Sequence, residues 1–228
     1  MAPFRLGLSV SLRPVSEVSG GDWLADARVS PLGPPGFEAY VRVLHPFAAT
    51  SEGQDRIEGH LPEDELAALV DVLAHHTRTP DECFHALWDG YGEILGGEAV
   101  GFLSFAAGPA AWPGRIFTKP KPPQPPPPAF APEVLDGPRL RVAGREHLLF
   151  VGPIADAGHW GAASFGHGIP RDINSPNLLW PDDHAWSVAT DIDTTWTGVG
   201  GSTGLADDLL ADPRLEVVRT RHESKETR

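Results

Sequence analysis

SPNLLWPDDHAWSVATDIDTTWTGVGGS, residues 175–202, is the stretch that constrains the fold most strongly. It holds three of the seven tryptophans, four aspartates and one histidine. Trp186, Val188 and Ile192 alternate with polar or small residues, the period-two pattern of a strand with one buried face. TTWTGVGG follows a turn near Asp193 and can pair back. The segment therefore predicts an antiparallel hairpin late in the chain.

Similar but shorter patterns predict further strands. Residues 37–44 and 84–88 alternate apolar and polar side chains, and an apolar run at 147–151 ends at a Gly-Pro pair. No internal repeat is found. Strands and helices in mixed order, with the late hairpin, predict a single α+β domain on a mainly antiparallel sheet with two or three helices.

The strongest helix pattern is PEDELAALVDVLAHH, residues 62–76. Proline and three acidic residues suit its first turn, and two histidines suit its last turn. The expected buried stripe consists of Leu66, Leu69, Val70 and Leu73. A last short helix follows residue 202 and ends at an Asp-Pro pair.

Composition sets the expected domain boundaries. Residues 1–20 show weak periodicity and are expected to form a poorly ordered arm, whereas 21–218 form the domain. Residues 48–59 are polar and predict a mobile loop. KPKPPQPPPPAFAP, residues 119–132, predicts an inserted polyproline loop. The last residues, 219–228, read as a charged tail.

The chain is acidic, with 31 Asp and Glu against 18 Lys and Arg and a net charge of −13. This charge argues against nucleic-acid or anionic-membrane binding, both of which need a cationic surface. No apolar run reaches the length of a membrane span or a signal peptide. A single cysteine, Cys83, excludes an intramolecular disulfide and fits a reducing compartment, so a cytoplasmic location is expected.

Three segments carry a family resemblance: GFEAYVRVLHP (36–46), TPDECFHALWDGYG (79–92) and SPNLLWPDDHAWSVATDIDTTWTGVGGS (175–202). Together they resemble a family of actinobacterial proteins of roughly 200 residues and unknown function. The resemblance implies a shared fold, but it implies no activity, cofactor or catalytic residue. Size, acidity and fold class are also similar to those of immunity proteins, an analogy of class alone.

Acidic residues and one histidine in 175–202 are the catalytic candidates. Asp182, Asp183 and His184 are consecutive, and Asp191 and Asp193 lie two residues apart on one strand face. Carboxylates with an imidazole could bind a divalent cation or exchange protons, as in a metal-assisted hydrolase. A structural alternative is that Asp182 and Asp183 form a turn while Asp191 and Asp193 line the solvated sheet face.

Two binding candidates flank these residues. Trp180, next to Pro181, is expected to be exposed and to contact a partner protein. Gly201, Ser202 and Thr203, in GVGGST, run from a strand into a helix start, where amide groups could hold a small anion.

The ten histidines lack the paired spacing of zinc ligands, so we expect no metal site, and no cofactor motif is found. Cys83 is expected to be a small buried apolar residue rather than a nucleophile. The favoured hypothesis is a non-enzymatic protein-binding or regulatory domain, of the immunity-protein kind, with a hydrolase and a small-anion binder as alternatives. The proline-rich segment suits docking to a partner.

Overall fold

The computed structural model describes residues 12–25, 29–50, 53–95, 127–165, 170–171 and 173–222. Its main element is a sheet in which nine strands of the described chain pair, every pairing antiparallel. The order is β1-β7-β5-β8-β9-β10-β2-β11, with β6 also on β7. The strands are β1 (Arg13–Pro14), β2 (Ala39–Leu44), β5 (Cys83–Trp88), β6 (Leu140–Val142), β7 (Arg145–Gly152), β8 (Leu178–Pro181), β9 (Ser187–Ala189), β10 (Trp196–Gly201) and β11 (Val217–Thr220).

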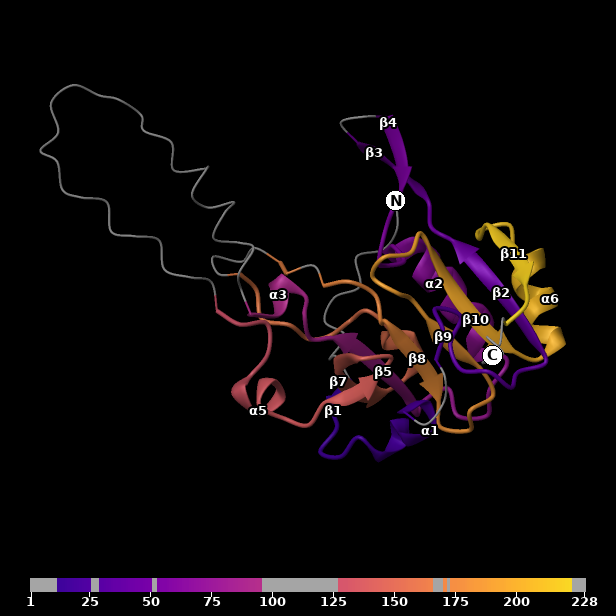
Figure 1. Ribbon diagram of the computed structural model, residues 1–228. Helices are drawn as coiled ribbons and strands as arrows, with labels where there is room; N and C mark the ends of the chain where they lie inside the picture. The colour runs from indigo at the N-terminus through magenta and orange to yellow at the C-terminus, as the bar shows by residue number, and fades with distance from the viewer. Residues whose placement is uncertain are drawn as a thin grey trace, which may run out of the picture.

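A separate hairpin and several helices complete the described chain. The hairpin projects away from the body, between β2 and α2 in the chain (Figure 1). Its strands are β3 (Phe47–Thr50) and β4 (Gly53–Arg56). The helices are α1 (Asp22–Ala25), α2 (Glu63–Ala74), α3 (Gly92–Leu95), α5 (Pro132–Leu135) and α6 (Thr203–Ala211), with 3-10 turns η1 (Ser19–Gly21) and η2 (Ile154–Asp156). The predicted α+β class with a mainly antiparallel sheet is confirmed, and none of the described helices is long and apolar enough to cross a membrane.

Residues 175–202 supply three neighbouring strands at the centre of this sheet. β8 pairs with β9 and β9 with β10, and Val199 lies opposite Val188 in the β9–β10 hairpin. β8 pairs on its other side with β5, and β10 with β2. The predicted late hairpin is therefore present, and it connects the two halves of the sheet.

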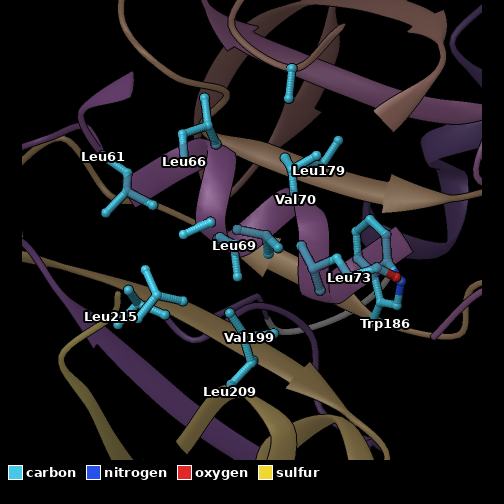
Figure 2. Packing of buried hydrophobic residues seen from close by; sticks show 14 of the residues in the cluster. Leu61, Leu66, Leu69, Val70, Leu73, Leu179, Trp186, Val199, Leu209 and Leu215 are labelled. Atoms are coloured by element: carbon cyan, nitrogen blue, oxygen red, sulfur yellow. The ribbon is translucent and has the colours of Figure 1, made fainter. Parts of the chain in front are cut away.

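Helices α2 and α6 cover one face of the sheet. The predicted stripe of α2 is buried, and it packs with Leu179, Trp186 and Val199 from the sheet (Figure 2). The indole Nε1 of Trp186 donates a hydrogen bond to the carbonyl of Leu73 at 3.1 Å. That carbonyl lies in the last turn of α2 and also accepts the His76 amide at 3.0 Å, so the indole bond ties the end of the helix to the sheet.

Glycines let a chain segment lie flat on the opposite face. An added Cβ at Gly198 would lie 2.6 Å from the Leu32 Cα, and one at Gly200 would lie 2.6 Å from a ring carbon of Phe37. Residues 29–37, which we call the cover segment, therefore reach β10 at backbone contact distance. Tyr40 secures the segment by donating its hydroxyl to the Pro34 carbonyl at 2.8 Å.

Several boundary predictions are corrected. Residues 12–20 are not an arm, because β1 pairs with β7 and Leu12 is buried. The loop predicted at 48–59 is mostly the β3–β4 hairpin, whose polar residues are exposed on both faces. The charged tail begins later than residue 219, because β11 extends through Thr220. Of the proline-rich segment 119–132, residues 119–126 lie outside the described chain, as do residues 1–11 and 223–228.

Gly198→Ala should destabilise the protein by roughly 1–3 kcal/mol, because the new Cβ meets backbone atoms that cannot move independently. Gly204→Ala is the control, since its Cβ would meet its nearest neighbour only at 3.8 Å, within helix α6. Urea unfolding of both variants measures the difference. Equal stability of the two variants would show that the cover segment does not pack tightly on β10.

Candidate functional site

The five catalytic candidates lie in two separate turns. Asp182, Asp183 and His184 are in the turn that leads from β8 to β9, whereas Asp191 and Asp193 are in the turn that leads from β9 to β10. The two groups therefore occupy opposite ends of β9. Nowhere in the described chain do three or more His, Cys, Asp or Glu side chains converge as metal ligands would.

Asp183 joins the β8–β9 turn to the loop before β5. Its carboxylate accepts hydrogen bonds from the Thr77 hydroxyl at 2.8 Å, the Arg78 amide at 2.9 Å and the Ala185 amide at 3.2 Å. Partial burial raises the pKa of this carboxyl, but these hydrogen bonds outweigh it and hold the pKa below its usual value. Asp183 is thus a structural acceptor, and the turn predicted for Pro181–Asp183 is present.

Trp180 is not exposed, contrary to the prediction. It has no accessible surface, because Phe84 stacks on its ring at 5.3 Å and Trp23 meets it edge-on at 6.2 Å. His184 stacks on the other indole, that of Trp23, at 4.4 Å and adopts a positive φ of 53°. The buried aromatic group forms because α1 lies over β8, a long-range contact that the alternation of 175–202 does not reveal.

Asp191 and Asp193 meet a single cation, Arg145. Each carboxylate lies 3.2 Å from a guanidinium nitrogen, and the amide of Asp193 donates to the Asp191 carboxylate. The structural alternative, in which Asp191 and Asp193 line the solvated face of the sheet, is wrong, because both residues follow β9 in a turn. A cavity of about 80 Å³ beside Arg145 has room for a few water molecules.

The GVGGST amides are occupied by the protein itself. Ser202 caps α6 by accepting the Leu205 amide at 3.2 Å, and the Thr203 amide donates to the Glu38 carboxylate at 3.2 Å. At Gly201 an added Cβ would approach a Leu205 methyl at 2.5 Å. The glycines thus serve close packing, and a carboxylate of the chain already takes the place expected for an anion.

Three buried histidines are neutral structural groups. His45, His85 and His147 are almost completely inaccessible, and burial lowers the pKa of each, that of His85 to about 4. His45 Nδ1 donates to the Ile57 carbonyl at 2.8 Å, so its Nε2 accepts from the Thr197 hydroxyl at 2.9 Å. This arrangement needs the uncharged imidazole.

Cys83 is fully buried, as predicted, and burial raises the pKa of its thiol to about 12. A thiol held so firmly in its protonated form is a poor nucleophile.

Two surface features were missed by sequence reasoning. One is the outer edge of β11 together with the β3–β4 hairpin, for which the β-branched residues Val217, Val218 and Thr220 were the available signal. The other is a cavity of about 470 Å³ between the start of α2 and the loop residues 157–162 and 173–175. No sequence pattern could have predicted it, since its walls come from segments nearly a hundred residues apart.

No protein-family model, no curated protein and no solved structure matches this chain.

Asp183→Ala should lower the free energy of unfolding by about 2 kcal/mol, because it removes the acceptor for two amides and one hydroxyl. Asp182→Ala, its exposed neighbour, is the matched control and should change stability by less than about 0.5 kcal/mol. Chemical denaturation measures both. A larger loss for Asp182→Ala would contradict the structural role of Asp183.

Stability should fall as the pH drops from about 6.5 towards 4. The folded protein holds His85 and the other two histidines neutral while the unfolded chain protonates them, so unfolding takes up protons and is favoured by acid. For His85 alone, the shift to about 4 corresponds to on the order of 3 kcal/mol. Urea unfolding at several pH values measures the slope.

His85→Leu should flatten this slope, because it removes the buried imidazole that the unfolded chain protonates. An unaltered slope in His85→Leu would mean that the buried imidazole is not the titrating group.

Proposed function

We propose that this protein is a non-enzymatic binding domain that recognises another protein through the outer edge of β11. The carrying observation is that β11 ends the sheet with no neighbour on its outer side in the described chain, whereas every candidate catalytic side chain except Asp182 makes contacts within the fold. Sheet edges of this kind bind extended segments of partner proteins by strand addition.

The outward backbone groups of β11 follow from its pairing with β2. The Leu44 amide donates to the Glu216 carbonyl at 2.8 Å, and these two residues lie opposite each other in the register. In an antiparallel ladder every second residue bonds to the neighbouring strand. Val217 and Arg219 therefore point their amide and carbonyl groups outward.

This edge lacks the usual protection against strand addition. Natural edges carry prolines, bulges or charged side chains that block pairing. The single charged side chain of β11, Arg219, is drawn to Asp207 of α6. Val218 is 42% exposed, so the strand offers an apolar side chain beside its free backbone groups.

The β3–β4 hairpin lies beside the start of β11 and extends the proposed binding surface. Arg56 of the hairpin forms an ion pair at 2.8 Å with Glu216, which directly precedes β11. The Arg56 guanidinium also lies 4.3 Å from the centre of the Phe47 ring. Phe47 is 58% exposed. Because a two-stranded hairpin is only marginally stable in water, contact with a partner would stabilise it.

The net charge of −13 favours a partner of net positive charge, because complementary charge speeds encounter, and it disfavours nucleic acid. We place the protein in the cytoplasm on account of its single cysteine. We also propose that the protein belongs to the uncharacterised actinobacterial family that it resembles, and that its role is of the immunity-protein kind. The metal-assisted hydrolase has less support, since its five residues share no common centre.

Affinity purification from the native host, with the full chain as bait, tests the proposal. The double variant Phe47→Ser with Val218→Lys should reduce recovery of a specific partner by roughly tenfold, as for loss of an interface hot spot. Leu95→Ser is the matched control, because Leu95 is also exposed but lies on α3, away from β11 in the sheet order. Quantitative mass spectrometry measures the recovery.

Hydrogen exchange on the purified complex then reports the binding mode. Strand addition should protect the outward amides of Val217 and Arg219 when the partner is added. Absence of any specific partner, or equal recovery by the double variant, would contradict the proposal.

A further inference from the structure

A cavity with polar and apolar walls lies between the start of α2 and the loop residues 157–162 and 173–175. Its volume of about 470 Å³ falls in the range of small-molecule sites. Trp160, with its indole bonded to the Asn174 carbonyl at 2.9 Å, and Leu61 form part of a firm wall. Neither α2 nor this loop contributes a residue to the edge proposed for partner binding.

Several side chains of the cavity wall have unused hydrogen-bonding capacity. Ser175 is only 6% exposed and accepts the Leu61 amide at 2.9 Å, yet its own proton has no acceptor in the described chain. The His159 imidazole makes no hydrogen bond there, and His60 uses only Nδ1, towards the Glu58 carbonyl. A buried hydroxyl that still has a proton to donate needs a ligand or a water as acceptor.

The remaining groups around the cavity also favour a negatively charged ligand. Arg171 donates to the carbonyls of Glu93 and Pro127 and forms no ion pair within the described residues. α2 starts after Pro62 without a side-chain cap, so the amides of its first turn are free of helical partners. Glu63, at the rim, is the one carboxylate among the described lining residues, and Asp64 and Glu65 of the same helical turn do not line the cavity.

We propose that this cavity binds the oxyanion end of a small molecule, a carboxylate or a phosphate group, with Ser175 and His159 as hydrogen-bond donors and Arg171 as the compensating charge. In a chain of net charge −13, the described residues that line this cavity carry one carboxylate against one guanidinium, so the acidic excess of the chain is absent from this part of its surface. The apolar surface of Leu61, Leu66 and Ile173 would contact the rest of the molecule.

Calorimetric titration of the full chain tests the site, with sodium phosphate and sodium malonate as probes and sodium chloride at equal ionic strength as reference. Saturable binding of either probe beyond chloride is expected. Binding of phosphate alone would identify a phosphate site, and binding of malonate alone a carboxylate site. The titration needs no partner protein, so its failure leaves the proposed strand addition untouched.

Three variants tie the binding to the cavity. His159→Ala should raise the dissociation constant of the probe about tenfold, as expected for the loss of a hydrogen bond to a charged group. Glu63→Gln should lower the dissociation constant, because it removes a negative charge beside the bound anion. His75→Ala, at the far end of α2, should leave the dissociation constant unchanged. Binding no stronger than that of chloride, or an unchanged constant in His159→Ala, would overturn the proposal.

Discussion

Burial of both faces of the central strands β8, β9 and β10 is the constraint on which the rest of the structure depends. A strand that alternates can leave one face in water, but these three are covered on both sides. On one side Trp186 and the stripe of α2 exclude water, with Trp186 also closing the last turn of that helix. On the other side Gly198 and Gly200 let the cover segment, residues 29–37, approach the backbone. The two layers hold a sheet whose strands come from distant parts of the chain.

The two proposed binding sites lie where this double cover stops. The centre of the sheet carries buried, neutral histidines and a protonated cysteine, which are groups suited to packing rather than to chemistry. The outer edge of β11 and the cavity at the start of α2 keep backbone or side-chain groups that have no partner within the described residues. Unused hydrogen-bonding capacity is costly when buried, so its location is physically informative. A partner strand and a small oxyanion are the ligands that we propose for those two sets of groups.

The acidic run in residues 175–202 illustrates how proximity in sequence differs from convergence in space. Asp183 and Asp191 are eight positions apart, but β9 lies between them, so their turns face opposite ends of the sheet. Each carboxylate has a local role: Asp183 accepts the Arg78 amide and the Thr77 hydroxyl from the loop before β5, and Asp191 pairs with Arg145. Trp180 was misjudged for a related reason. Its neighbour Pro181 suggested a surface turn, but α1 places Trp23 against its ring.

The sequence by itself determined the α+β class, the antiparallel hairpin of 175–202, the buried stripe of α2 and the burial of Cys83. These follow from periodicity and from local backbone chemistry, which act over a few residues. Only the tertiary structure decided that β8 pairs with β5 and that the cover segment lies on Gly198. It also decided that Ser175 shares a hollow with His159. Such contacts depend on which distant surfaces bury each other, and periodicity within one segment carries no information about the partner surface.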